Sequence, residues 1–344
     1  MKQHTHAQHN YKIYQPIPLN AGAVKDWKQV EIEELFEPLI PLGAYSATAN
    51  SILTSSVYYG EHDCSPYIDQ NALAGSLLTI FVRQKVAERL LVAQQLLPED
   101  HYLLVFDAYR PLRVQESLYH FYYDHLRALH PNKSKANLSE ETQQYVSIPT
   151  TDQTRPSPHS TGGAIDLALV RLPRAQSEIL RHINSRLIND PLEAAVREGL
   201  ETQKATLVRR YATMLNFGTP FDHGGEKAAI AYFEKQLAVD APLHPGEVEA
   251  CTNRRLLYEV MTQVGMQAYG PEWWHFNAPE SQMGAKTAGL AKATYGAATL
   301  STQNEAHEKL RRAVYSGASA AQAKSRQTMT TNRWPIEIIM PQNC

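Results

Sequence analysis

The spacing of hydrophobic positions predicts where helices and strands lie along the chain. Over residues 73–97 apolar side chains recur every three or four positions and Pro98 follows them, which is the longest helical signal in the chain, so we expect the main core helix there. The apolar run 103–106 predicts a buried strand, and Pro111 opens a second amphipathic helix over 112–129. A side chain at the junction between that strand and that helix would therefore lie at a strand end.

Polar and turn-rich segments interrupt this pattern in the second half of the chain. Residues 131–156 are polar, and residues 173–215 are charged with few strong core positions, so we expect both to be insertions over the surface. A turn-rich segment follows at 217–227. After it we expect a helix over 253–266 and a strand over 271–277, which reads Pro-Glu-Trp-Trp-His-Phe-Asn.

The two ends of the chain differ in composition from its middle. Residues 1–44 are rich in proline and charge, and the short amphipathic stretch at 30–36 predicts an edge segment laid on the body of the protein. Residues 281–344 are rich in Ala, Thr, Gln and Ser, with one helix expected around 305–315. We therefore expect a lead segment over 1–44, one domain over 45–280 and a C-terminal extension over 281–344.

Composition and charge narrow the classes of function. Hydrophobic residues make up 43% of the 344 positions and charged residues 20%, as in ordinary globular proteins. The net charge of -2 lacks the positive footprint of a nucleic-acid-binding protein. No apolar run is long enough for a signal peptide or a membrane span, so we expect no membrane partner and a cytoplasmic location, or a periplasmic one if the natural start differs. Three widely spaced cysteines indicate free thiols.

The most informative stretch is Ser-Pro-His-Ser-Thr-Gly-Gly-Ala-Ile-Asp over 157–166. It places His159 and Asp166 seven residues apart across a Gly-Gly turn. In the strand that follows, Asp166 shares a face with two small alanines, Ala164 and Ala168, which leaves room for a metal ion beside the carboxylate. On these residues alone, an Asp that caps a loop and a satisfied surface His explain the pattern equally well.

A second stretch, 271–277, carries a glutamate and a histidine within an aromatic run. Gly270 and Pro271 argue against a helical HExxH motif, and the aromatic residues favour a strand. On a strand Glu272 and His275 would face opposite sides, so Glu272 must lie in the turn before the strand if both serve one site. The alternative is a Trp-rich core strand with an incidental His.

Taken together, the two stretches supply the donor set of a catalytic zinc site. Two imidazoles and one carboxylate are three protein ligands, which leaves one position open for water. Glu272 is then free to serve as general acid and base. Positive charge is still needed at the developing oxyanion, and Arg110 at the predicted strand end is the candidate.

These residues resemble the D-alanyl-D-alanine dipeptidase family, the zinc D,D-dipeptidases of vancomycin resistance. The family pattern SxHxxGxAxD followed by ExWH is present at 157–166 and 272–275, and the segment 107–111, Asp-Ala-Tyr-Arg-Pro, resembles the one that carries the family's transition-state arginine. The resemblance covers about 45–279. It implies one Zn²⁺ per chain on His159, Asp166 and His275, with catalysis by Glu272 and Arg110.

The resemblance also implies a fold and three substrate contacts. The fold would be α+β, with a small central antiparallel sheet flanked by helices as in hedgehog-like proteins, plus the helical insertions and the C-terminal extension. Asp222, in a loop similar to the family's Phe-Asp loop, would bind the substrate ammonium, and Tyr45 and Ser157 would lie near the substrate. This sequence departs from some members at Pro158, where they have a serine.

The function implied is zinc-dependent hydrolysis of D-alanyl-D-alanine or a related dipeptide. Two alternatives stay open. One is a D,D- or L,D-carboxypeptidase that acts on longer peptidoglycan stem peptides of the cell wall. The other is a non-catalytic zinc-containing binding module, against which the presence of Glu272 and Arg110 speaks. The expected partner is a small dipeptide, without nucleic acid or membrane, and the sequence does not determine the oligomeric state.

Overall fold

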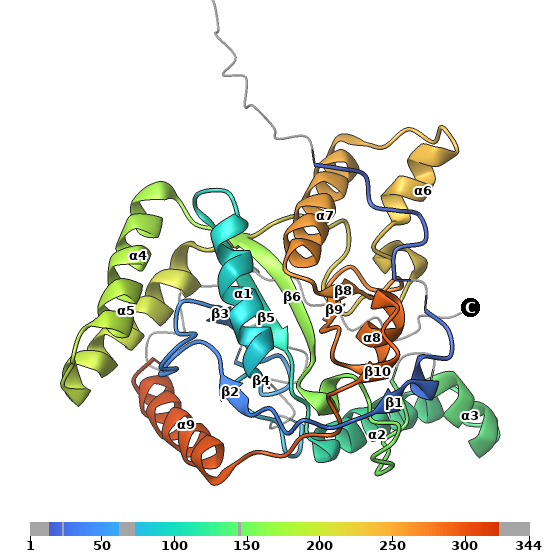
Figure 1. The fold of residues 1–344 in the computed structure, drawn as a ribbon, viewed down its shortest axis with the longest axis horizontal. Coiled ribbons are helices and arrows are strands. Elements are labelled where there is room, and N and C mark those ends of the chain that lie inside the picture. Colours follow the sequence, from blue (N-terminus) through green and yellow to red (C-terminus); the bar gives the residue numbers. More distant parts are fainter. Residues whose placement is uncertain (1–13, 23, 62–72, 144–145, 323–344) are drawn as a thin grey trace, which may run out of the picture.

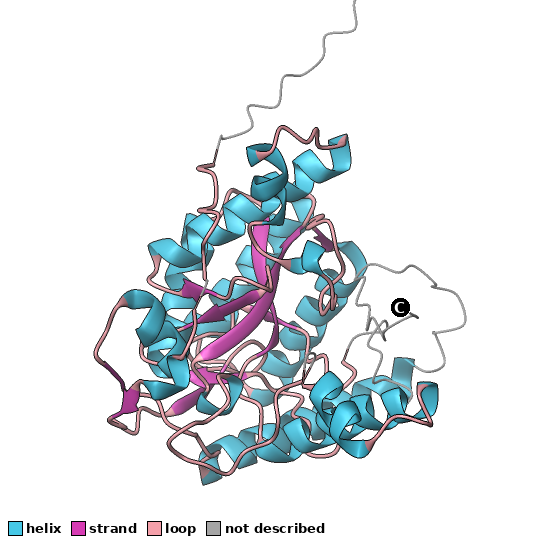
Figure 2. Ribbon diagram, turned by 90° about the vertical axis from the view of Figure 1, so that its right-hand side faces the viewer, coloured by secondary structure: helices cyan, strands magenta, loops and turns pink. Residues whose placement is uncertain are grey.

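The computed structural model describes residues 14–22, 24–61, 73–143 and 146–322. Helices surround small sheets, which makes the fold α+β as predicted (Figures 1 and 2). Cys251 is a buried free thiol, and Cys64 and Cys344 lie outside the described residues. No helix within the described ranges is both long and apolar enough to cross a membrane.

The main sheet has six strands and carries the centre of the core. Its order is β3 (Leu53–Thr54), β5 (His101–Asp107), β6 (Ala164–Arg171), β9 (His275–Asn277) and β8 (Gln267–Ala268), and β7 (Thr213–Met214) also pairs with β6. All of these pairs are antiparallel except β3 with β5 at one edge. The predicted antiparallel sheet is thus present, with one parallel edge strand.

Two smaller sheets bring segments from distant parts of the chain together. β2 (Leu39–Pro41) pairs antiparallel with β4 (Phe81–Arg83), and β1 (Glu31–Ile32) pairs parallel with β10 (Lys292–Ala293). β1 lies within the amphipathic stretch 30–36, so this stretch does form an edge segment on the body of the protein.

Helices cover the sheets on both sides (Figure 1). They are α1 (Gln84–Leu96), α2 (Leu112–Leu129), α3 (Lys135–Thr142), α4 (Arg174–Asn189), α5 (Ala194–Tyr211), α6 (Tyr232–Ala238), α7 (Pro245–Gln263), α8 (Gln282–Ala288) and α9 (Thr302–Gln322). The described residues also contain the short 3-10 turns η1 (Trp27–Gln29), η3 (His159–Thr161) and η4 (Glu226–Ala228). The helix predicted over 112–129 and the strand predicted over 103–106 are both confirmed.

The predicted boundaries of three elements were wrong. The helix expected from residue 73 begins only at Gln84, because 81–83 pair with β2 as a strand, a role that suits the aromatic Phe81 and the β-branched Val82. The helix expected from residue 253 begins at Pro245, where proline at the first turn and a capping box fix its start. The strand expected over 271–277 begins only at His275, after a turn.

The two polar segments expected as insertions both contain helices, and the second is largely helical. The first contains α3, and the second contains α4 and α5, which pack on each other through Ile183, Leu187 and Leu200. The segment 173–215 contributes more to the core than its composition predicted, since Leu180 and Leu207 are buried in the main core. Amphipathic helices can bury one face against a body even when their overall composition is charged.

Candidate active site

The register of the main sheet places chemistry-bearing side chains in one row. Asp107 at the end of β5 is the direct partner of Asp166 on β6, and Asp166 is the direct partner of His275 on β9. Neighbouring strands lie about 4.8 Å apart, so these three residues, although far apart in sequence, are brought to one place by hydrogen-bonded pairing.

A tight turn brings His159 to the same place. The 3-10 turn η3 holds His159, and the amide of Gly162 donates to the His159 carbonyl at the end of that turn. Gly162 has a φ of 70°, and a Cβ at this position would lie 2.4 Å from the side chain of Leu39. Only glycine fits there, so the first glycine of the Gly-Gly turn sets the direction of His159.

Three donor groups converge in the buried interior. His159 Nε2 lies 3.2 Å from His275 Nδ1 and 3.5 Å from Asp166 Oδ2, and His275 Nδ1 lies 3.0 Å from Asp166 Oδ1. All three side chains are buried. Their donor atoms lie within 4.8 Å of one another, which makes them a candidate metal site within the described residues.

Hydrogen bonds from the far side of each ring fix which nitrogen faces the centre. His159 Nδ1 lies 2.9 Å from the carbonyl of Ala108, which can only accept, so Nδ1 carries the proton and Nε2 offers its lone pair. Asn277 donates its Nδ2 to Met283 and turns its Oδ1 toward His275 Nε2 at 3.2 Å. A neutral His275 ring therefore carries its proton on Nε2 and presents its Nδ1 lone pair to the centre.

Lone pairs that face one another repel unless a cation lies between them. When both rings are neutral, as binding of a metal ion requires, no proton is available for Asp166 Oδ1, which is buried and has no hydrogen-bond partner among the described residues. Without a metal ion, burial lowers the pKa of His275, but Asp166 and Glu272 hold it above its usual range. A metal ion would satisfy all three donors at once, and the protein contacts behind each ring are those that commonly orient metal-binding histidines. The residues present therefore fit a metal ion.

Glu272 meets the geometric condition set by the sequence. It lies in the turn before β9, where its amide donates to the Tyr269 carbonyl, and its Oε2 is 3.6 Å from His275 Nδ1. Its side chain is 37% exposed because it faces a pocket. Burial of the carboxyl and repulsion by Asp166 raise the pKa of Glu272 to about 7, despite the opposing effect of His275. A carboxyl with a pKa near neutrality suits both acceptance and return of a proton.

Arg110 lies on the other side of the donor cluster. Asp107 Oδ2 accepts from Arg110 Nε at 3.0 Å and from Nη2 at 2.6 Å, and Asp166 lies 3.9 Å away. The guanidinium also stacks over the Tyr58 ring at 4.7 Å. Burial alone would lower the pKa of Arg110, but Asp107 and the other nearby acidic groups hold it above its usual range. Arg110 is therefore a fixed positive charge near the cluster.

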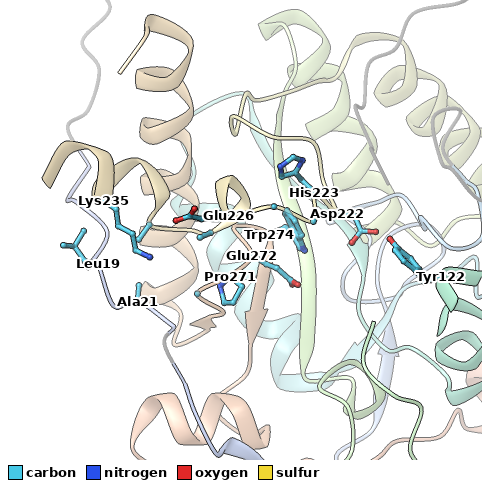
Figure 3. A pocket seen from close by; sticks show the side chains of 15 residues that line it. Leu19, Ala21, Tyr122, Asp222, His223, Glu226, Lys235, Pro271, Glu272 and Trp274 are labelled. Carbon is cyan, nitrogen blue, oxygen red and sulfur yellow. The ribbon is translucent and has the colours of Figure 1, made fainter. Parts of the chain in front are cut away.

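A pocket of about 510 Å³ opens beside Glu272 (Figure 3). Asp222, Tyr122 and Trp274 line it together with Glu272. Asp222 has a φ of 65°, a left-handed conformation that aspartate tolerates better than most residues. Burial raises the pKa of Asp222 to about 8, and repulsion by Glu272 and Asp166 adds to this. A carboxylate in that position would gain from a bound cation.

Comparisons with known proteins bear on this arrangement. The family model described as D-ala-D-ala dipeptidase, of the M15 peptidases, matches residues 201–293, a segment that includes Asp222, Glu272 and His275. A D-alanyl-D-alanine dipeptidase from Synechocystis sp. is 24% identical over 275 residues, which cover 74% of this chain and 87% of that protein. This chain is similar in sequence to the D-ala-D-ala dipeptidases. The resemblance inferred from the motifs is confirmed, and the class of enzyme that it supports is a peptidase.

Two of the substrate contacts suggested by the dipeptidase motifs lie away from the pocket lining. Ser157 holds η3, since its carbonyl accepts from the Ser160 amide at 3.0 Å. Tyr45 donates its amide to Glu201 on α5, and acidic and basic groups of α5 and α9 surround its ring. The structure therefore brings six of the eight predicted residues around one centre and gives Ser157 and Tyr45 other neighbours.

Sequence reasoning missed three residues that contact this peptidase site. Asp107 binds Arg110 and lies 3.1 Å from His159 Nδ1, Tyr58 stacks on Arg110, and Asn277 orients His275. Asp107 and Asn277 could have been found from the sequence, because Asp107 is the first residue of the segment 107–111 and Asn277 lies two residues after the motif at 272–275. Tyr58 had no local signal, since its contact with Arg110 spans a long stretch of chain.

Proposed function

We propose that this chain is a zinc-dependent dipeptidase that hydrolyses D-alanyl-D-alanine, or a closely related dipeptide, to free amino acids. The observation that carries the proposal is the convergence of three potential metal ligands, His159, Asp166 and His275, beside Glu272, Arg110 and Asp222. Two histidines and one carboxylate are a common protein ligand set for catalytic zinc. The relation to the D-ala-D-ala dipeptidases supports the substrate class.

Each residue has a distinct chemical task in this proposal. A zinc ion held by His159, Asp166 and His275 would supply Lewis-acid chemistry at the scissile carbonyl. Glu272 accepts a proton from the attacking water and returns it to the leaving amine, for which a pKa near 7 is well placed. Arg110 supports the negative charge that develops on the carbonyl oxygen.

Asp222 gives the proposal its preference for dipeptides. Its carboxylate lines the same pocket as Glu272 and gains from a cation there, because nearby acidic groups repel its charge. The free ammonium of a dipeptide supplies that cation through a charge-assisted hydrogen bond. A peptide extended at its amino end has no ammonium at this distance from the scissile bond and leaves Asp222 unpaired.

The size of the pocket favours one alternative, a carboxypeptidase that acts on longer stem peptides. The cavity of about 510 Å³ has room for more than two alanine residues. Replacement of Asp222 with Ala separates the two functions. A dipeptidase loses activity on dipeptides far more than on longer stems, whereas equal losses on both substrates favour the carboxypeptidase.

The first test is the release of D-alanine from D-alanyl-D-alanine by zinc-loaded protein. We expect activity that is lost in Glu272→Ala, that is retained in Glu140→Ala on the exposed surface of α3, and that is absent on the acetylated dipeptide and on L-alanyl-L-alanine. No activity on any dipeptide or stem peptide would refute the enzyme and leave a zinc-containing binding module.

A further inference from the structure

The pocket beside Glu272 continues well past the reacting groups. Its far part is lined by Leu19 and Ala21 from the N-terminal segment, by Ala231 and Lys235 from the α6 region, and by Pro271. At roughly 30 Å³ per water molecule, the cavity of about 510 Å³ corresponds to about 17 waters, which exceeds the number of non-hydrogen atoms in two linked alanines. The site thus has unused space with apolar walls.

The two ends of this pocket carry opposite charges. Asp222 and Lys235 both line it and lie on opposite sides of Glu272 in Figure 3. The ammonium of Lys235 is exposed and forms no ion pair or hydrogen bond with the side chains and backbone of the described residues. Its basic neighbours are paired, since Lys227 binds Glu247 at 2.9 Å and Arg255 binds Glu234 at 2.6 Å. The free lysine is therefore the one that faces the pocket.

Contacts behind Lys235 fix the position of this end of the pocket. The buried carboxylate of Glu234, the preceding residue, accepts two hydrogen bonds from Arg255 on α7 and one from the Ile17 amide at 3.1 Å. One side chain thus ties α6 to both α7 and the N-terminal segment that supplies Leu19 and Ala21. The helix that carries Lys235 and the segment that carries Leu19 and Ala21 are therefore held together.

A pocket that is anionic at one end and cationic at the other is complementary to a free peptide. We propose that Lys235 binds the C-terminal carboxylate of the substrate while Asp222 binds its ammonium, and that the residue after the scissile bond has an apolar side chain larger than that of alanine. This inference rests on the proposed function. Exposed Glu226 lines the same end, so Lys235 has to offset its charge for one carboxylate to bind, and a second, acidic group on the substrate is disfavoured there. A reversed peptide meets like charge at both ends, so the charges also fix its direction.

The test is equilibrium binding to the zinc-loaded Glu272→Ala protein, which does not depend on turnover. The probes are D-alanyl-D-leucine as free acid and as C-terminal amide. We expect Lys235→Ala to weaken binding of the acid about tenfold and to leave binding of the amide unchanged. Lys235→Glu reverses the preference for the acid over the amide. Lys227→Ala, a matched lysine outside the pocket lining, leaves both affinities unchanged.

Two outcomes overturn the inference, and both differ from a failure of the proposed function. Unchanged affinity for the acid in Lys235→Ala, or equal losses for acid and amide, removes the role of Lys235. Tighter binding of D-alanyl-D-alanine than of D-alanyl-D-leucine refutes the preference for a side chain larger than that of alanine. Absence of hydrolysis by the protein with Glu272 intact, together with binding that depends on Lys235, refutes the dipeptidase but not the carboxylate contact.

Discussion

Replacement of Asp107 with Asn tests whether this carboxylate holds the two halves of the site together. Its Oδ2 accepts from Arg110 at 2.6 and 3.0 Å and lies 3.1 Å from the protonated Nδ1 of His159. The amide keeps the shape but loses the charge. Hydrogen bonds to charged groups contribute about 1.5–3 kcal/mol each, and loss of a contact behind a metal ligand weakens metal binding about 10- to 100-fold.

The expected result for Asp107→Asn is a rise of about 10- to 100-fold in the dissociation constant for Zn²⁺, which corresponds to about 1.4–2.8 kcal/mol. Competition with a chromogenic chelator at fixed pH measures it. Asp152→Asn is the matched control, because Asp152 is exposed and its side chain accepts hydrogen bonds from the nearby Thr154. An unchanged zinc affinity in Asp107→Asn, with Arg110 still needed for activity, would refute the reasoning.

Three further predictions concern stability. Gly162→Ala forces a side chain into a left-handed conformation and a close contact, so we expect a loss of at least about 1–2 kcal/mol in urea unfolding, and a neutral result would contradict the strained turn. In metal-free protein the pKa of Asp222 is raised to about 8, mainly by burial. Between about pH 4 and 8 the folded state therefore keeps a proton that the unfolded state has released, so stability falls as the pH rises through this range. Asp222→Asn should therefore raise the melting temperature most at pH 8 and above and least near pH 4, and the reverse order would exclude this. Glu308 on α9 accepts hydrogen bonds from the backbone amides of residues 78 and 79 at 2.8 and 2.9 Å. Glu308→Ala should therefore lower the melting temperature clearly more than Glu305→Ala, which changes an exposed position of the same helix. Equal effects would show that these contacts of α9 are dispensable for stability.

Much of the candidate site could be predicted because its chemistry lies in short motifs. The residue types at 157–166 and 272–275 are costly to bury without a partner, which marks them as functional before any contact is known. The period of apolar residues fixed α2 and β5 for a similar local reason, since one face of each element must be buried.

Other features depend on partners that are distant in sequence. The helix predicted from residue 73 begins later in the structure, because residues 81–83 form β4 and their backbone pairs with β2, which is distant in sequence. The contact of Tyr58 with Arg110 and the placement of Leu19 and Lys235 in one pocket follow from packing, for which the sequence carries no local pattern.

The sequence by itself therefore determined which groups could bind a metal ion and transfer a proton, because those properties belong to residue types and their spacing. Only the tertiary structure decided which of them meet. Strand register sets Asp107, Asp166 and His275 side by side, and a shift of one residue would turn each strand's side chains to the opposite face. The lining of the pocket was decided in the same way, because it depends on where the N-terminal segment and α6 pack.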